Sequence, residues 1–303
     1  MKTVVIAALS AIALLTCVRP ILAQPAAKAD PHAGHAMEAA PQAATGAAQA
    51  GAAHLPPAEE QAKERLNTSP RHGEYADITL PGGKLRAWVS YPERKDKAPV
   101  VIVIHEIFGL SDWIRGVADQ LAADGYIAIA PDLLSGKGPN GGGTEAFATR
   151  DDVVAGVRGL APDDVVSKLN AVREYGIKLP AANGKTATVG YCWGGSTSFM
   201  YATKQDGLNA AVVFYGSSPS DATTLSAVKA PVLGLYGEND ARVNATIDGA
   251  KAELTRQNKV FEMHIYPGAG HGFLRAQAGQ NGANLKATEQ AWPTMLAFFK
   301  KHL

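Results

Sequence analysis

One short stretch of this chain limits its possible folds more than any other. An apolar run (186–189) precedes it, and a segment able to form a helix (196–204) follows it. This order is typical of a nucleophile elbow, a tight strand-to-helix turn that raises one side chain above the edge of a sheet. The turn needs small neighbours, because a Cβ atom on either side would clash across it. The stretch reads Gly190-Tyr191-Cys192-Trp193-Gly194-Gly195.

The raised residue would be Cys192, where most such elbows have serine. The following helix would point its amino terminus at the turn, and its free N–H groups favour negative charge on the sulfur. The alternative is that Cys192 is a small buried residue packed between glycines.

Strand-like and helix-like segments alternate along the chain from residue 99 onward. Residues 99–104 form a continuous apolar, β-branched run, which is typical of a strand buried on both faces of a parallel sheet. The alternation predicts an α/β fold with a doubly wound, mostly parallel sheet, entered through an antiparallel hairpin. Between residues 132 and 161 we expect a Gly-rich loop (136–143) and then a helical stretch through Arg150. The expected strands are 75–80, 85–91, 99–104, 126–130, 186–189, 210–215, 232–236 and 260–266, and the expected helices are 112–124, 163–175, 196–204, 246–257 and 284–303.

Composition and charge exclude several classes of protein. The chain has 303 residues, a formal net charge of +1 and 46% hydrophobic residues, which allows one sizeable core. So balanced a charge gives no basis for binding nucleic acid or an anionic membrane surface. Zinc-finger spacing and the phosphate-binding Gly-x-x-x-x-Gly-Lys-Ser/Thr motif are both absent from the sequence. We therefore expect no metal, and we expect a monomer.

The amino-terminal segment resembles a secretory signal peptide. Lys2 precedes an apolar run (3–18), and Ala23 offers a small residue for cleavage before Gln24. We expect residues 1–23 to be removed and the mature protein to be periplasmic or secreted. The alternatives are a membrane anchor, for which the run is short, and lipid attachment at Cys17. After cleavage Cys192 would be the one remaining thiol, which favours a reactive role for it.

Residues 24–69 are rich in Ala, Pro, Gln and Gly and poor in aromatic and β-branched residues. Such a segment cannot bury enough apolar surface to offset its chain entropy, so we expect a disordered linker before a folded domain at 70–303. The alternative for this segment is loose binding of a soft metal through His32, His35, Met37 and His54.

Chemically useful residues follow four of the expected strands, where the ligand of an open α/β sheet binds. Cys192, Asp240 and His271 occur in the order nucleophile, acid, base. His271 can move protons near neutral pH, and Asp240 can hold its ring in one tautomer. Taken alone, Asp240 could instead cap the next helix and His271 could be an exposed loop histidine. Their joint occurrence at successive strand ends predicts a catalytic triad.

An oxyanion hole needs two converging donors near this cysteine. The Trp193 N–H, directly after the nucleophile, is one candidate, and the Ile107 N–H in the loop after residue 104 is the other. Glu106 is unusual beside them, because its carboxylate would oppose the developing charge. The alternative for Glu106 is a solvated loop residue.

Four motifs together resemble the dienelactone hydrolase family, over roughly residues 73–303. They are His105-Glu106-Ile107-Phe108-Gly109, Gly190-Tyr191-Cys192-Trp193-Gly194-Gly195, Gly237-Glu238-Asn239-Asp240 and Gly270-His271-Gly272-Phe273. The resemblance implies an α/β-hydrolase fold, hydrolysis of a lactone or ester such as a dienelactone, and no cofactor. The family's name-giving members are cytoplasmic, so the export signal sets this chain apart.

The resemblance also implies further roles in the site. Glu106 would hold the resting thiol and help to deprotonate it when substrate binds. Arg275 would bind a substrate carboxylate, and Arg150 is the candidate for a second such arginine. Tyr215 matches a pocket tyrosine, with plain packing as its alternative.

The sequence thus predicts an enzyme that cleaves a small-molecule ester or lactone. A Cys192 thiolate would attack the carbonyl, and a thioester would then be hydrolysed with the help of His271. The competing hypothesis is a non-catalytic envelope protein that uses the same scaffold for binding. A thiol-redox function lacks a second mature cysteine.

Overall fold

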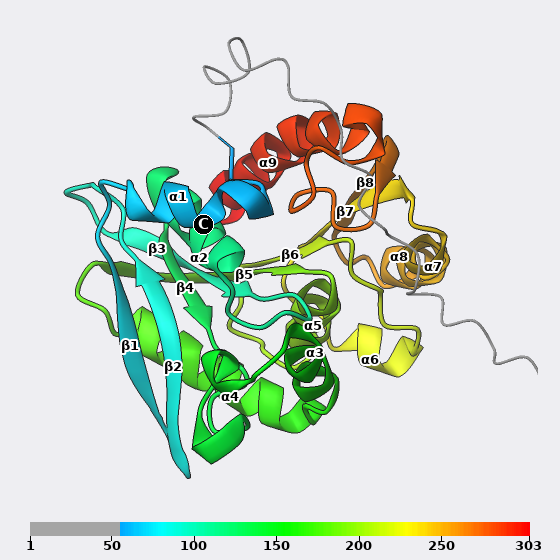
Figure 1. Ribbon diagram of the computed structural model, residues 1–303. Coiled ribbons are helices and arrows are strands. Elements are labelled where there is room, and N and C mark those ends of the chain that lie inside the picture. The colour runs from blue at the N-terminus through cyan, green and yellow to red at the C-terminus, as the bar shows by residue number, and fades with distance from the viewer. Residues whose placement is uncertain (1–54) are drawn as a thin grey trace, which may run out of the picture. The chain divides into compact units, whose positions relative to one another are not determined.

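A computed structural model describes residues 55–303 (Figure 1). The predicted signal peptide and residues 24–54 of the predicted linker lie outside these residues. Within residues 55–303, no helix is both long and apolar enough to cross a membrane.

The fold is built on one eight-stranded sheet in the order β1-β2-β4-β3-β5-β6-β7-β8. β1 and β2 form an antiparallel hairpin, and β2 also pairs antiparallel with β4. From β4 onward the neighbouring strands are parallel. The predicted fold class is therefore confirmed. The strands are β1 (Gly73–Leu80), β2 (Gly83–Ser90), β3 (Ala98–Ile104), β4 (Ile127–Pro131), β5 (Ala182–Tyr191), β6 (Ala210–Phe214), β7 (Val232–Asn239) and β8 (Phe261–Gly270).

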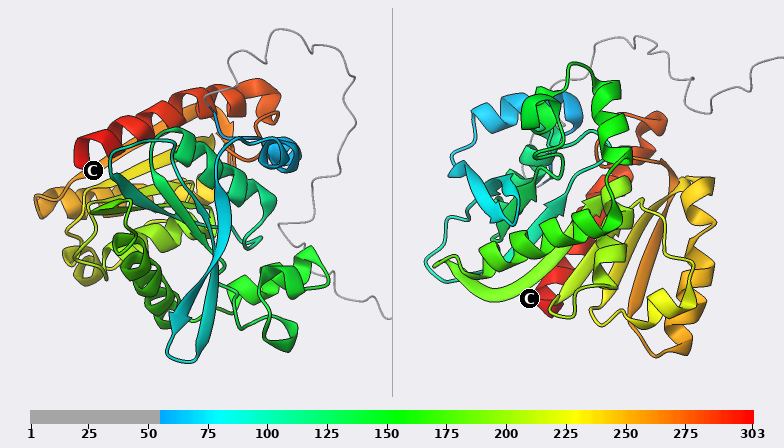
Figure 2. Two further views of the ribbon diagram at one scale, coloured as in Figure 1. Left: turned by 90° about the vertical axis from the view of Figure 1, so that its left-hand side faces the viewer. Right: turned by 90° about the horizontal axis from the view of Figure 1, so that it is seen from below.

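Helices cover both faces of the sheet (Figure 2). α1, α2 and α9 contribute to one apolar core, and α4, α5 and α8 contribute to the other. The helices are α1 (Glu59–Asn67), α2 (Asp112–Ala123), α3 (Arg150–Arg158), α4 (Pro162–Ile177), α5 (Trp193–Ala202), α6 (Ala222–Ser226), α7 (Ala241–Asn244), α8 (Ile247–Arg256) and α9 (Ala283–His302). Short 3-10 turns lie at η2 (Pro139–Gly141), η3 (Thr144–Ala146) and η4 (Gln280–Gly282).

The strand β3 shows why its sequence is apolar throughout. Val101 and Val103 point into the core beneath α2 and α9, whereas Val100, Ile102 and Ile104 point into the core beneath α4. All residues of β3 are buried. A strand covered on both faces gains from burial at every position, so it has no polar alternation.

The prediction of a disordered linker as far as residue 69 is wrong for residues 55–69. This segment forms α1 and packs beside α2 (Figure 1). Ala62 is fully buried between the helices, and the Trp113 Nε1–H donates to the Pro57 carbonyl over 2.9 Å. Composition misled here because the segment has few apolar side chains and is held by hydrogen bonds to distant residues. Residues elsewhere in the chain thus supply the stabilising contacts that this segment cannot form within itself.

The helical stretch expected to run through Arg150 is also wrong, since α3 begins at that residue. Thr149 caps α3 by accepting from the Asp152 N–H over 3.1 Å. The preceding loop is organised by Asp132, whose carboxylate accepts from both the N–H and the hydroxyl of Thr144, each over 2.7 Å. Because an N-cap residue marks the start of a helix, the residues before Thr149 do not belong to α3.

Candidate active site

Five neighbouring parallel strands end at one edge of the sheet, and each is followed by a residue that the sequence singled out. β3 leads to His105 and Glu106, β5 to Cys192, β6 to Tyr215, β7 to Asp240 and β8 to His271. This edge is where α/β sheets bind ligands, because the strands' carboxyl ends leave a crevice between the outgoing loops.

Cys192 lies in the sharp turn predicted for it, between the last residue of β5 and the first of α5. Its backbone has φ 56° and ψ −116°, a conformation that non-glycine residues rarely adopt. The Cys192 N–H donates to the Phe214 carbonyl over 3.0 Å, which ties the turn to β6. Strained backbone of this kind is typical of functional sites, where the surrounding structure holds it in place.

The glycines beside Cys192 are required by close backbone approaches. A Cβ atom on Gly190 would lie 1.8 Å from the Gly194 carbonyl oxygen. A Cβ atom on Gly194 would lie 2.3 Å from the Ile104 carbonyl oxygen. Both contacts are far below van der Waals separation and involve backbone, which cannot move aside cheaply.

Asp240 and His271 are in direct contact. Asp240 Oδ2 and His271 Nδ1 lie 2.5 Å apart, and the Asp240 side chain is 7% exposed. Asp240 precedes α7 but makes no capping hydrogen bond with its side chain. Its carboxylate therefore serves His271 rather than the helix, and the capping alternative is wrong.

The charge environment favours a protonated His271. Burial lowers the pKa of His271, but the hydrogen bonds and charges of Asp240 and Cys192 outweigh burial and raise that pKa to about 10. These contacts favour the imidazolium form of the ring, which faces both Asp240 and the sulfur of Cys192. Such a cation stabilises a thiolate beside it.

Glu106 is buried and forms an ion pair with Arg275. Glu106 Oε2 and Arg275 Nε lie 2.7 Å apart, although the angle is not that of a hydrogen bond. Burial raises the pKa of Glu106, while the charges of Arg275 and His271 oppose that rise. The solvated-loop alternative for Glu106 is therefore wrong. Glu106 contacts Arg275 in this structure. Its predicted role in holding and deprotonating the Cys192 thiol therefore stays a prediction.

A second carboxylate reaches the same arginine from α1. Glu59 Oε2 pairs with Arg275 Nη1, and Glu59 Oε1 lies 3.1 Å from Arg150 Nη2. The Phe108 ring packs against both guanidinium groups. Its centroid lies 3.6 Å from the Arg150 Cζ and 5.2 Å from the Arg275 Cζ. The structure thus brings the two predicted arginines together.

Sequence reasoning missed Glu59 entirely. It lies in the segment assigned to the linker, 216 positions before Arg275. The one available signal was a pair of acidic residues, Glu59 and Glu60, in the first turn of a possible helix.

Tyr215 lies beneath the histidine. It is fully buried and has φ 40°, and its ring centroid is 5.2 Å from that of His271 in an edge-on arrangement. Burial and the charge of Glu106 raise the pKa of Tyr215 well above its usual value, so its hydroxyl stays neutral. Its packing against His271 is clear, and its predicted contact with substrate stays a prediction.

The predicted oxyanion donors belong to two segments, the first turn of α5 and the loop after β3. Trp193 is the first residue of α5, where backbone N–H groups have no partner within the helix. Ile107 is two residues beyond His105, whose ring stacks on Trp193 with centroids 5.5 Å apart. The His105 Nδ1 also lies 2.7 Å from the Glu106 carbonyl oxygen. The ring stack joins the loop after β3 to the start of α5. The oxyanion role of Trp193 and Ile107 stays a prediction.

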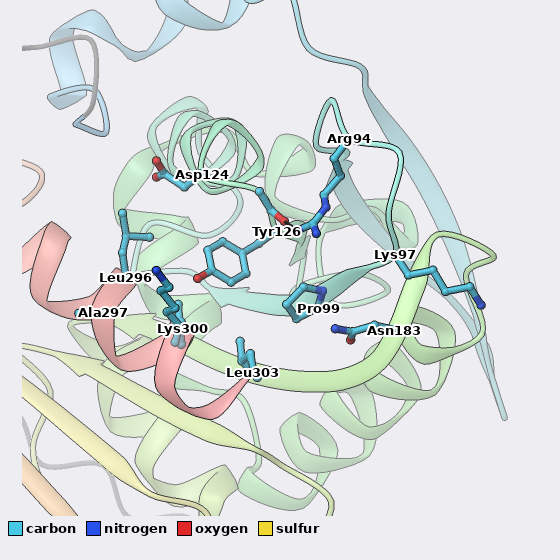
Figure 3. Close-up of a pocket in the computed structure, with 12 residues that line it drawn as sticks. Arg94, Lys97, Pro99, Asp124, Tyr126, Asn183, Leu296, Ala297, Lys300 and Leu303 are labelled. Atoms are coloured by element: carbon cyan, nitrogen blue, oxygen red, sulfur yellow. Dashed lines mark hydrogen bonds between the residues drawn. The ribbon is translucent and has the colours of Figure 1, made fainter.

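The rest of the described chain was expected to hold no metal, and it contains a pocket away from the triad candidates. Within residues 55–303, no group of three His, Cys, Asp or Glu side chains is arranged to hold a metal ion. A pocket of about 520 Å³ lies at the opposite edge of the sheet, where β3 and β5 begin and α9 ends (Figure 3). Arg94, Lys97 and Lys300 line it, and none of the triad candidates does.

The sheet order, the turn at Cys192 and the strand-end residues define an α/β-hydrolase. The sequence profile of the dienelactone hydrolase family matches residues 85–303. The chain belongs to that family, as the resemblance predicted, and it is an ester or lactone hydrolase by class.

Individual relatives agree with this assignment. The chain is 33% identical over 240 residues to a "Putative carboxymethylenebutenolidase" of Salmonella typhimurium, covering 74% of this chain and 86% of the relative. It is 30% identical over 219 residues to "Carboxymethylenebutenolidase 1" of Cupriavidus pinatubonensis, covering 69% and 91%. The crystal structure of a "Putative Dienelactone Hydrolase" from Klebsiella pneumoniae superposes with a TM-score of 0.68 at 27% identity, covering 76% and 98%.

Proposed function

We propose that this protein hydrolyses a lactone or carboxylic ester through Cys192, His271 and Asp240, with a thioester intermediate. The observation that carries the proposal is the 2.5 Å contact between His271 and Asp240 beside a cysteine held at positive φ. An ordinary thiol has a pKa of about 8.5, so a cysteine nucleophile needs such a partner at neutral pH.

The first half of the reaction forms the thioester. The Cys192 thiolate attacks the carbonyl carbon, a C–S bond forms, and the oxygen becomes an oxyanion that the Trp193 and Ile107 N–H groups stabilise. Collapse of this intermediate breaks the C–O bond. The imidazolium of His271 gives its proton to the leaving alcohol or enol oxygen.

The second half releases the acid. Neutral His271 takes a proton from water as the water attacks the thioester carbonyl, and the C–S bond breaks. The thiolate is regenerated beside the imidazolium, and a carboxylate leaves. Asp240 holds the histidine ring in one orientation in both halves and stabilises its charge. Each step uses the chain's own residues and water.

The names of the relatives indicate the class of substrate. Two of them are described as carboxymethylenebutenolidases, which suggests an unsaturated lactone or a related ester as the small-molecule substrate here. We propose that this reaction takes place outside the cytoplasm, because of the predicted signal peptide in residues 1–23.

The test is turnover of a simple aryl ester by Cys192 variants. Cys192→Ala removes the sulfur and leaves the glycines that shape the turn, so we expect a folded protein whose rate falls by about three orders of magnitude or more. Cys192→Ser should also be poor, because a hydroxyl is far harder to ionise than a thiol beside the same imidazolium. Circular dichroism checks the fold of both variants.

Cys17→Ser in the full-length chain is the matched control, since Cys17 is the other cysteine, and its rate should equal that of the wild type. Iodoacetamide should label Cys192 and abolish turnover in parallel. Wild-type rates in folded Cys192→Ala would remove the thiol from the mechanism. No turnover by the wild type itself would favour the non-catalytic binding protein.

A further inference from the structure

The carboxylate of Glu59 bridges the two arginines beside the proposed active site. One oxygen pairs with Arg275 and the other lies 3.1 Å from Arg150. Arg275 is shared between Glu59 and the buried Glu106, and its side chain is 22% exposed. Burial lowers the pKa of Arg275, but the charges of Glu106 and Glu59 outweigh that effect and raise it. Two nitrogens of its guanidinium, Nη1 and Nε, thus face carboxylates of the chain itself.

The docking of α1 holds Glu59 in this position. The Glu59 N–H donates to the Arg275 carbonyl over 3.0 Å, so backbone and side chain both join these residues. Two residues before α1, the Pro57 carbonyl accepts from Trp113, and the Pro56 carbonyl accepts from the Gln277 amide over 2.9 Å. The backbone of Glu59 and that of the residues just before it are thus both held by hydrogen bonds. The Glu59 carboxylate is therefore preorganised beside the two arginines.

The local charges then decide which substrates suit the site. Arg150 and Arg275 contribute two positive charges, and Glu59 and Glu106 in their ionised forms offset them. A substrate carboxylate brought here would be a third carboxylate beside two occupied guanidiniums, and like charges at close range repel. An uncharged ester or lactone meets no such penalty.

We propose that Glu59 is a specificity-determining residue, which occupies Arg275 and Arg150 and directs the site towards esters and lactones that carry no free carboxylate. The proposal rests on the proposed hydrolase function. It concerns a residue outside the part of the chain that matches the family profile, which begins at residue 85. The arginines would bind an anionic substrate in a chain without this intramolecular carboxylate.

The experiment compares two aryl esters that differ in one carboxylate. p-Nitrophenyl acetate is neutral, and mono-p-nitrophenyl succinate carries a free carboxylate. The measured quantity is the ratio of kcat/KM for the succinate ester to kcat/KM for the acetate ester. Glu59→Gln removes the negative charge while keeping the length of the side chain and the backbone hydrogen bond. We expect the ratio to rise about tenfold or more, as for a gained hydrogen bond to a charged group.

Glu60→Gln is the matched control. It removes the same charge from the same turn of α1, but its side chain is exposed and forms no ion pair with Arg150 or Arg275. Its ratio should equal that of the wild type. The double variant Glu59→Gln/Arg275→Gln should lose the gain, because the gain requires a free guanidinium. An equal ratio in Glu59→Gln and Glu60→Gln would overturn the proposal, as would a wild type that prefers the succinate ester.

A binding measurement separates this proposal from the proposed function. Sodium succinate is titrated by calorimetry into Cys192→Ala and into Cys192→Ala/Glu59→Gln, neither of which needs to turn over. We expect tighter binding, by about tenfold, when Glu59 is replaced. If neither ester shows Cys192-dependent hydrolysis, the hydrolase mechanism fails while this titration still decides the role of Glu59. Equal succinate affinity in the two variants overturns the role of Glu59 and leaves the hydrolase mechanism standing.

Discussion

Replacing Asp240 by asparagine tests the electrostatic basis of the site most directly. The change keeps the size and shape of a side chain that is only 7% exposed, and it removes one negative charge from His271 Nδ1. Because the hydrogen bond and charge of Asp240 raise the pKa of His271, their loss must lower that pKa. The other upward contribution, from Cys192, stays in place.

The magnitude follows from the contact itself. A hydrogen bond to a charged partner contributes about 1.5–3 kcal/mol, and one pKa unit corresponds to about 1.4 kcal/mol. The pKa of His271, which lies at about 10 in the wild type, should therefore fall by roughly one to two units. The imidazolium would then begin to lose its proton at a pH closer to neutral, and its partner thiolate would be less stabilised.

The assay is a pH titration by nuclear magnetic resonance of protein labelled at histidine carbons, with the His271 signal assigned through His271→Gln. Iodoacetamide labelling of Cys192 across the same pH range gives a second measure, which should slow at neutral pH in Asp240→Asn. A wild-type His271 that titrates near 6.5, or the same midpoint in both proteins, would refute the account of a raised histidine pKa.

Two further predictions concern the supports of the site. Gly190→Ala should give misfolded, insoluble protein, because its Cβ would lie 1.8 Å from the Gly194 carbonyl oxygen; soluble protein with a wild-type circular dichroism spectrum would contradict this. Ala62→Asp would bury an unpaired carboxylate between α1 and α2, so the unfolding free energy should fall by about 2 kcal/mol or more, which corresponds to about 4–8 °C in Tm. The exposed neighbour Gln61→Asp should leave Tm nearly unchanged, and an equal loss in both variants would mean that α1 is not docked as described.

The sheet and the triad candidates could be predicted from sequence for a specific physical reason. Parallel strands buried on both faces are continuous apolar runs, and such runs are visible without any knowledge of tertiary contacts. Their carboxyl ends meet at one edge, so the residues directly after them must be neighbours. Cys192, Asp240 and His271 all follow strands in this way.

The contacts of α1 could not be predicted, because they depend on partners far along the chain. Composition correctly showed that residues 55–69 cannot form a core of their own, but it does not report hydrogen bonds to Trp113 or Gln277. Arg150 shows the same limit. The resemblance suggested that Arg150 binds a substrate carboxylate, but only the structure shows that it starts α3 after the cap at Thr149 and pairs with Glu59.

The docking of α1 joins the first and last parts of the folded region, which has a consequence for how the chain folds. Glu59 and Arg275 are 216 positions apart, and Pro56 and Gln277 are 221 positions apart. Contacts across such long loops carry a large closure entropy and form after the local ones. α1 and its packing partner α2 are synthesised early, but Arg275 and Gln277, which hold the start of α1, are among the last residues to be made. The cluster of Glu59, Arg150 and Arg275 is therefore assembled late, and the substrate preference it sets would be acquired only when the whole domain has closed.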